Sequence, residues 1–321
     1  MDALAPSLSL NRAFLTDVID GLSSKTPAVP ARWLYDHRGS ELFDAITRLP
    51  EYYPTRTEMA LLERHSGEVA QQAGTGPVVV ELGAGSAEKT PILLRAIDPA
   101  AYVPIDISGE YLEGSVEALR LLFPDLAIHP LEGDFMRSIR LPEGLPDRPR
   151  LGFFPGSTIG NMVPATAVDL LRSFREALGT GAWLLIGMDI RKDVEVLLRA
   201  YDDSAGATAA FNLNLLHRIN AELDGAIDVA AFRHKAVWND IKSRIEMHLE
   251  AVRDTFFTIA GHRFAFTAGA TIHTENSHKY GVRDSRLLLE AAGWSPRREW
   301  SDEGGRFSLV LACAEPPRIA P

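Results

Sequence analysis

Cysteine is nearly absent from this chain of 321 residues, which contains only Cys313. One cysteine cannot form an internal disulfide or a cluster of thiolates around a metal ion. Long apolar runs are missing too: the stretch around residues 183–186 is far shorter than the roughly 18 residues that a membrane span needs. Asp2 stands where a secretory signal peptide would be basic. These absences predict a cytoplasmic protein that is not embedded in a membrane.

Basic residues are in the minority, with 33 Lys and Arg against 43 Asp and Glu and a net charge of −10. This balance repels phosphate backbones, so we expect no nucleic-acid partner. No coiled-coil heptad is evident, and we expect a monomer. The 46% hydrophobic and 24% charged residues are typical of a globular protein. At roughly 150 residues per domain, the length suggests about two domains.

Strands and helices alternate through the middle of the chain. Short apolar runs predict strands at 78–82, 101–106, 126–131, 151–154 and 182–189, with intervening helices that include 109–123 and 164–178. Alternation at this spacing predicts a doubly wound α/β core, a parallel sheet with helices on both faces. A helix at 285–292 and a strand at 307–314 are expected to complete it.

The remaining segments have a different pattern. Helices are expected at 11–22, 41–49 and 57–73, with a loop over 49–55 because prolines 50 and 54 favour extended neighbours. Residues 200–225 appear helical, and 230–275 alternate as antiparallel hairpins do. We therefore expect a core domain of residues 57–199 and 281–321 and a smaller α+β substrate domain of residues 1–56 and 200–280.

A glycine-rich turn, Glu81-Leu82-Gly83-Ala84-Gly85, follows the first expected strand, where open α/β sheets bind ligands. A dinucleotide fingerprint would need glycine or alanine at position 88, and a phosphate-binding loop would need glycine there. The residue is Glu88, whose carboxylate would repel a phosphate. The remaining form, E-x-G-x-G, resembles motif I of S-adenosylmethionine (SAM) methyltransferases. The residues expected to contact SAM in this segment are Gly83, Gly85 and Lys89.

Acidic residues follow the next two expected strands. Asp106 comes 23 residues after Gly83 and could accept hydrogen bonds from both ribose hydroxyls. Asp134 could accept one from the adenine amino group, with Phe135 packing beside the ring. Capping of the following helix is the alternative for each aspartate, and Asp106 would suit a nicotinamide dinucleotide equally well. The three strand ends together predict SAM as co-substrate.

Several longer runs point to one family: residues 33–36, 47–58, 156–161, 199–203, 209–212, 244–247 and 274–277. Together they resemble the histidine Nα-methyltransferases of ergothioneine biosynthesis, and the match extends over nearly the whole chain from about residue 30. The resemblance implies a Rossmann-like class I SAM methyltransferase core with an inserted smaller α+β substrate domain. It also implies an enzyme without a metal that trimethylates the α-amine of L-histidine, through the mono- and dimethyl forms, to hercynine.

The resemblance also implies roles for individual residues. Asn161 and Tyr201 would hold the substrate carboxylate and position the amine. Glu275 and Ser277, which alternation places on one side of a strand, would bind the two imidazole nitrogens. Tyr35 would relay the amine proton or order a water molecule that does. The other residues implied to line the acceptor site are Tyr52, Gly156, Phe211 and Met247.

Each of these residues also has an ordinary alternative role. Tyrosines often pack half-buried, Glu275 could face solvent, and Met247 could belong to the core. A metal site made of His273, Glu275 and His278 is disfavoured because alternation puts His278 on the opposite face. The acceptor could also be another aromatic amino acid or an imidazole amine. A non-catalytic SAM-binding module and a nicotinamide dehydrogenase are the alternatives from other functional classes.

Overall fold

The computed structural model describes residues 6–74, 76–137 and 139–315, of which residues 6–11 are described by their backbone alone. The chain divides into two compact units, which we describe separately. The core unit comprises Tyr53–Lys192 and Ser277–Pro321, and the smaller unit comprises Met1–Tyr52 and Asp193–Asn276. The domain borders predicted from the sequence, at residues 57, 200 and 281, lie a few residues later than these.

A seven-stranded sheet forms the centre of the core unit, in the order β11-β12-β5-β4-β1-β2-β3. The part β3-β2-β1-β4-β5 is parallel and has the doubly wound order 3-2-1-4-5. β12 runs antiparallel to both β5 and β11. The strands are β1 (Val78–Leu82), β2 (Ala101–Asp106), β3 (Leu131–Glu132), β4 (Arg150–Phe154), β5 (Trp183–Asp189), β11 (Trp294–Ser301) and β12 (Phe307–Ala314).

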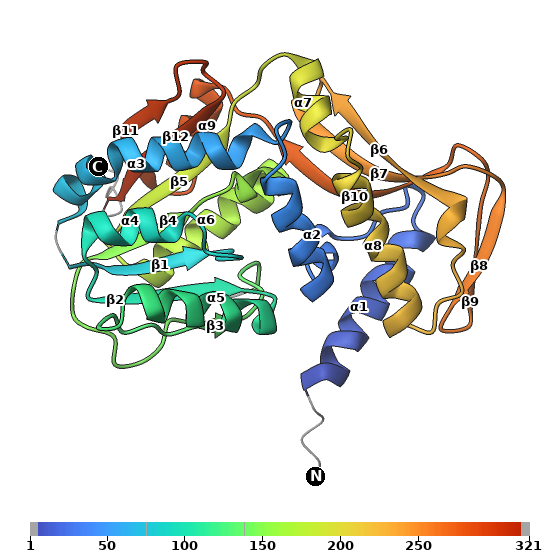
Figure 1. The fold of residues 1–321 in the computed structure, drawn as a ribbon, viewed down its shortest axis with the longest axis horizontal. Coiled ribbons are helices and arrows are strands. Elements are labelled where there is room, and N and C mark those ends of the chain that lie inside the picture. Colours follow the sequence, from blue (N-terminus) through green and yellow to red (C-terminus); the bar gives the residue numbers. More distant parts are fainter. Residues whose placement is uncertain (1–5, 75, 138, 316–321) are drawn as a thin grey trace, which may run out of the picture. The chain divides into compact units, whose positions relative to one another are not determined.

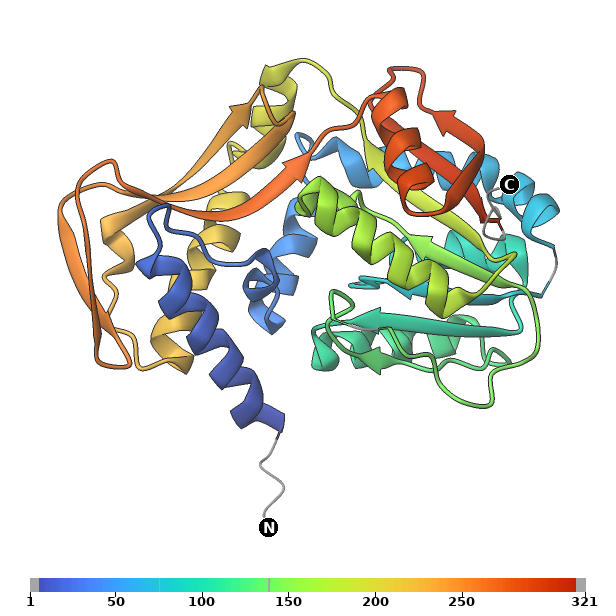
Figure 2. The ribbon, with the colours of Figure 1, turned by 180° about the vertical axis from the view of Figure 1, so that it is seen from behind.

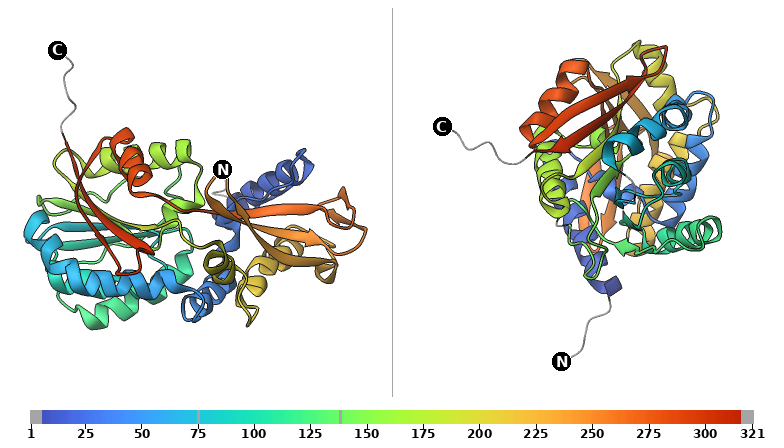
Figure 3. Two further views of the ribbon diagram at one scale, coloured as in Figure 1. Left: turned by 90° about the horizontal axis from the view of Figure 1, so that it is seen from above. Right: turned by 90° about the vertical axis from the view of Figure 1, so that its left-hand side faces the viewer.

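Helices cover both faces of this sheet. α6 (Pro164–Leu178) and α9 (Val282–Ala291) lie on the face seen in Figure 2. α3 (Tyr53–Ala73), α4 (Thr90–Ile97) and α5 (Gly109–Leu122) lie on the face seen in Figure 1, and the left view of Figure 3 shows both helical layers. Val78 and Val80 pack into one apolar cluster and Val79 into the other. Burial on both faces explains the run of three valines with which β1 begins.

The smaller unit combines helices with antiparallel strands, and α8 packs against β6 and β7. Its main sheet has the order β10-β7-β6, and β8 and β9 form a separate hairpin. Among the described residues, no helix is long and apolar enough to cross a membrane. The elements are α1 (Pro6–Ser23), η1 (Ala31–Leu34), α2 (His37–Thr47), α7 (Val194–Tyr201), α8 (Ala207–Glu222), η3 (Val229–Ala231), β6 (Phe232–Asn239), β7 (Arg244–Ala251), β8 (Thr255–Ile259), β9 (His262–Phe266) and β10 (Thr271–His278), whose last two residues belong to the core unit.

The helices α1, α2, α3 and α9 begin three to five residues earlier than the sequence suggested, and local chemistry explains two of these starts. α3 starts at Tyr53, inside the expected loop over 49–55, with Pro54 in its first turn. Proline is tolerated there because the first N–H groups of a helix have no intrahelical partner. α2 starts at His37 rather than at residue 41 because the Asp36 side chain accepts a 2.8 Å hydrogen bond from Gly39 N and caps the helix.

Two strands also differ from expectation. The strand expected at 126–131 is reduced to a single bridge at Ile128 and to β3. Pro130 lies between the two and cannot donate to the ladder. β11 was not predicted at all. It contains Pro296 and a bulge between Pro296 and Arg298, and such irregular strands are confined to sheet edges.

Candidate functional site

The glycine-rich turn after β1 has a backbone that favours glycine. Gly83 has φ +69° and Gly85 has φ +51°, in the left-handed region that side chains rarely adopt. Where a Cβ on Gly85 would lie, no heavy atom of the described residues comes within 4 Å. The turn therefore presents open backbone to a ligand.

Asp106 holds this turn from the end of β2. Its Oδ2 accepts a 2.9 Å hydrogen bond from Gly85 N, and its Oδ1 accepts one of 3.0 Å from Ser108 N. Burial raises the pKa of Asp106 above its usual value. The N–H of Ile107 also interacts with this carboxylate. A carboxylate has about four acceptor positions, so capacity is left for a ligand hydroxyl.

The turn after β3 lies beside the turn after β1. Gly133 N donates to Asp106 O over 2.8 Å, and Phe135 Cε1 is 3.8 Å from where a Cβ on Gly83 would lie. Asp134 Oδ1 accepts a 3.0 Å hydrogen bond from Met136 N. Asp106 and Asp134 thus each accept a hydrogen bond from the backbone N–H two residues later in the chain. These bonds stabilise the turns that contain the aspartates and do not cap a helix. The three expected strand ends meet within the core unit.

Glu81 of the glycine motif supports the sheet instead of lining the turn. Its carboxyl is buried and accepts hydrogen bonds from Tyr102 OH at 2.6 Å and from Thr90 Oγ1 at 2.8 Å. Burial raises the pKa of Glu81 to about 8, although both hydrogen bonds and nearby Lys89 oppose the shift. Glu81 therefore ties β1 to β2 and to the start of α4.

Lys89 has a partner that the sequence analysis missed. Glu58 of α3 is fully buried and forms a 2.5 Å ion pair with Lys89 Nζ. The same carboxylate accepts hydrogen bonds from Gly156 N at 2.8 and 3.0 Å. The carboxylate of Glu58 thus binds both Lys89 and Gly156, two predicted site residues that are far apart in sequence. The only signal for Glu58 was its place at the end of the run 47–58.

The turn over residues 156–161 is fixed to the ends of β5 and β10. Gly156 and Ser157 have φ of +78° and +57°, and Ser157 Oγ accepts a 2.9 Å hydrogen bond from Asp189 N. Gly160 O lies 2.9 Å from Nδ1 of His278. Asn161 ends the 3₁₀ helix η2 (Thr158–Asn161) that follows.

An aromatic cluster in the smaller unit contains four predicted acceptor residues. The Tyr35 ring lies 5.4 Å from that of Phe211, and the Tyr52 ring lies 6.0 Å from that of Tyr201. Phe43 of α2, which the sequence analysis did not single out, connects these pairs. Its ring lies 5.7 Å from Tyr35, 6.1 Å from Tyr52 and 6.0 Å from Phe211.

Glu275 of β10 meets this cluster through a hydrogen bond. Tyr35 OH donates to Glu275 Oε1 over 3.0 Å, and Glu275 is only 6% exposed. Solvation of Glu275, the alternative considered above, is therefore wrong. Burial, and then the charge of Glu275, raise the pKa of Tyr35 well above its usual value. The Tyr35 phenol thus keeps its proton at neutral pH.

Tyr201 and Met247 also make contacts through their backbone carbonyls. Tyr201 O lies 2.8 Å from Nε2 of the buried His234, which fixes the end of α7. Met247 of β7 is buried, and its carbonyl accepts a 3.0 Å hydrogen bond from Thr274 Oγ1.

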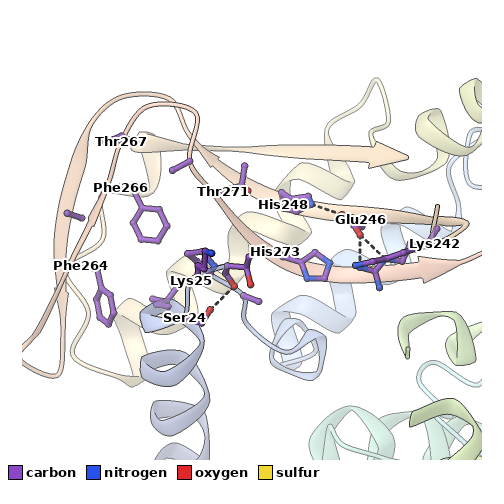
Figure 4. A pocket seen from close by; sticks show the side chains of 17 residues that line it. Ser24, Lys25, Lys242, Glu246, His248, Phe264, Phe266, Thr267, Thr271 and His273 are labelled. Carbon is purple, nitrogen blue, oxygen red and sulfur yellow. Dashed lines mark hydrogen bonds and ion pairs between the residues drawn. The ribbon is translucent and has the colours of Figure 1, made fainter. Parts of the chain in front are cut away.

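A cavity of about 750 Å³ also lies in the smaller unit (Figure 4), and none of the predicted site residues is among those that line it. His248 and His273 face it, and burial lowers the pKa of His273 to about 4. Within the described parts of the chain, no group of three or more His, Cys, Asp or Glu residues could hold a metal ion.

The sequence has counterparts among known proteins. The model of the family described as "Histidine-specific methyltransferase, SAM-dependent" matches residues 14–314. The chain belongs to this family. Membership confirms the predicted resemblance and enzyme class, and with the sheet order above it confirms the Rossmann-like SAM methyltransferase fold.

Individual relatives agree with this membership. The chain is 40% identical to a histidine N-alpha-methyltransferase of Mycolicibacterium smegmatis, over 95% of this chain and 96% of that one. It is also 40% identical to the protein of the same name from Mycobacterium tuberculosis, over 94% of both chains. Ergothioneine biosynthesis protein 1 of Neurospora crassa is 30% identical over 88% of this chain, which spans 33% of that longer protein.

Proposed function

We propose that this protein transfers methyl groups from SAM to the α-amino group of L-histidine. Three transfers give N,N,N-trimethylhistidine, or hercynine. Together they are the first step of ergothioneine biosynthesis. The observation that carries the proposal is the buried Glu275, which accepts the Tyr35 hydrogen bond beside the aromatic cluster. A carboxylate among aromatic rings suits a flat, neutral ring with one N–H to donate, as imidazole has.

The core unit supplies residues of the types that SAM needs. Gly83 and Gly85 would approach its amino-acid portion through open backbone, and Asp106 would accept from the ribose hydroxyls. Asp134 would accept from the adenine amino group, with Phe135 packing on the ring. Open space over Gly85 and the remaining acceptor capacity of Asp106 support this fit. Lys89, paired to Glu58, would lie near the carboxylate of SAM.

Different residues of the acceptor site would bind different groups of histidine. Glu275 and Ser277 would bind the imidazole nitrogens, and Asn161 and Tyr201 would hold the carboxylate and position the amine. Tyr52 would contact the ring or the amine. Phe211 would wall the pocket, and Gly156 and Met247 would line it. An amide and a phenol both donate hydrogen bonds, which a carboxylate accepts.

The amine has to be unprotonated and held in line with the methyl group that SAM supplies on its positive sulfur. A new N–C bond forms as the S–C bond breaks, and the amine proton must leave. An α-amine titrates near pKa ~8, so a weak base is enough. Because the pKa of Tyr35 is raised, its phenol cannot act as a base alone. It would accept the amine proton while its own proton passes to Glu275.

The product differs from the substrate in being a quaternary ammonium, which donates no hydrogen bond. The pocket therefore has to hold the growing group without a polar partner. The faces of Tyr52 and Tyr201, whose rings lie 6.0 Å apart, would accommodate it by cation–π contact.

Mass spectrometry tests the proposal directly. Purified protein is incubated with SAM and a mixture of the common amino acids, and all masses are followed with time. We expect histidine alone to gain one, two and then three methylene masses. Methylation of another amino acid would overturn the histidine assignment but not the SAM site. No methylation with SAM bound would leave an untested acceptor or a binding role. The proposal also includes a monomeric protein, a cytoplasmic location, catalysis without a metal and small molecules as the only partners.

A further inference from the structure

The hydroxyl of Ser277 lies against a buried ammonium group in the core unit. Lys279, two residues further along the chain, donates a 2.7 Å hydrogen bond from Nζ to Ser277 Oγ. Its side chain is 0% exposed, and Ser277 is 4% exposed. A charge buried to this degree needs fixed partners, so the Lys279–Ser277 contact is part of a larger arrangement.

Asp189, at the end of β5, is the counter-charge of that ammonium. Its Oδ2 lies 2.7 Å from Lys279 Nζ, and its Oδ1 lies 2.5 Å from Lys192 Nζ. Tyr53 OH donates to both carboxylate oxygens over 2.7 and 2.8 Å. Burial by itself would raise the pKa of Asp189, but the two ammonium groups outweigh it and hold the pKa below its usual value. Asp189 is therefore ionised and fixes Lys279 in place.

The direction of the Lys279–Ser277 bond follows from the chemistry of its partners. An ammonium has three protons to donate and no lone pair, so Ser277 Oγ must be the acceptor. The hydroxyl proton of Ser277 therefore points away from Lys279, and a charged donor behind the oxygen strengthens any hydrogen bond that this hydroxyl donates. Ser277 is thereby fixed as a hydrogen-bond donor.

We propose that Lys279 is a positioning residue that fixes Ser277 as a donor toward the substrate ring, and so selects the neutral imidazole of histidine. The inference rests on the proposed function. Neutral imidazole has one N–H and one lone pair. Glu275, which as a carboxylate can only accept, would take the N–H, and Ser277 would donate to the lone pair. An imidazolium ring offers no lone pair, and a phenyl ring offers neither group.

A pair of matched variants tests this role. Lys279→Met and Lys192→Met each remove one ammonium from Asp189, but only Lys279 donates to Ser277. We expect Lys279→Met to raise the KM for histidine by about tenfold, the loss of one hydrogen bond, with the Kd for SAM within twofold of wild type. Lys192→Met should leave the KM near wild type. Equal changes in both variants, or an unchanged KM in Lys279→Met, would overturn the proposal.

A double-mutant cycle separates positioning from a general structural role. Once Ser277→Ala has removed the hydroxyl, adding Lys279→Met should not raise the KM further. Independent, multiplying effects would overturn the inference. Circular dichroism checks folding. If Lys279→Met does not fold, Lys279→Gln enters the same cycle, because its neutral amide removes the charged donor behind Ser277 Oγ. If the wild type does not methylate histidine, the proposed function itself fails. If Ser277→Ala raises the KM and neither Lys279 variant does, only the inference about Lys279 fails.

Discussion

Tyr35 and Glu275 are 240 residues apart in sequence and are joined by a 3.0 Å hydrogen bond from the phenol to Oε1. The bond gives each group a defined state. Tyr35 stays protonated, because burial and the neighbouring carboxylate raise its pKa, and Glu275 is held at the edge of the aromatic cluster. The Oε1 atom of Glu275 accepts the phenol, and the proposed function assigns the same carboxylate to the imidazole N–H of the substrate.

Replacement of Tyr35 by phenylalanine tests the proton relay. The ring and its packing against Phe43 and Phe211 remain, but the path from the amine to Glu275 is interrupted. We expect kcat to fall by about 100-fold or more, since a general acid–base group typically contributes about 10²–10⁴-fold. Stopped-flow or steady-state assays with SAM give kcat, and calorimetry gives the Kd for SAM, which should not change. A variant with full kcat would assign the proton to another group.

Glu275→Ala tests which ligand this carboxylate serves. The substitution removes the acceptor proposed for the imidazole N–H, and the residues proposed for SAM lie in the core unit. We expect the KM for histidine to rise by at least about tenfold, with the Kd for SAM close to wild type. Equal losses in both would show that Glu275 does not act on the acceptor, and would contradict the assignment.

The sequence predicts the parallel core well because its strands are buried on both faces. β1 and β2 are almost fully buried, so each contains a run of neighbouring apolar residues that is easily recognised. The weak points have local causes. Pro130 interrupts the strand before β3, and Pro296 with its bulge makes β11 irregular. Neither segment shows the periodicity that identifies a strand.

The site residues could be predicted from the sequence only in part. Asp106 and Asp134 were predicted from position, because strand ends meet at one edge of a parallel sheet. Tyr35 and Glu275 could not be paired in this way, since no local pattern relates residues so far apart. Only the family resemblance brought them together. Phe43 and Glu58 were missed because a helical phenylalanine and a helical glutamate are both ordinary, and what distinguishes them is their tertiary contacts.

Glu58 provides a test of the core unit. In Glu58→Gln the shape is kept but the charge that holds Lys89 and the N–H of Gly156 is lost. We expect the Kd for SAM to rise by about tenfold and the free energy of unfolding to fall by about 3 kcal/mol, as for a broken buried pair. The matched control is Glu63→Gln, an exposed glutamate on the same helix, which should change neither. An unchanged Kd for SAM in Glu58→Gln would contradict the proposed role of Lys89 in SAM binding.

Glu81 predicts a pH dependence of stability. The pKa of Glu81 is raised from 4.5 to about 8 in the folded protein, chiefly by burial. Between these values the folded state keeps a proton that the unfolded state has lost, so this group lowers the free energy of unfolding as pH rises, by at most ~1.4 kcal/mol per pH unit. Glu81→Gln has no such proton. Urea unfolding at pH 5, 6, 7 and 8 should therefore show the variant gaining stability relative to wild type across this window, while all other titrations cancel in the difference. A constant difference between the two proteins would mean that Glu81 is ionised in the folded state.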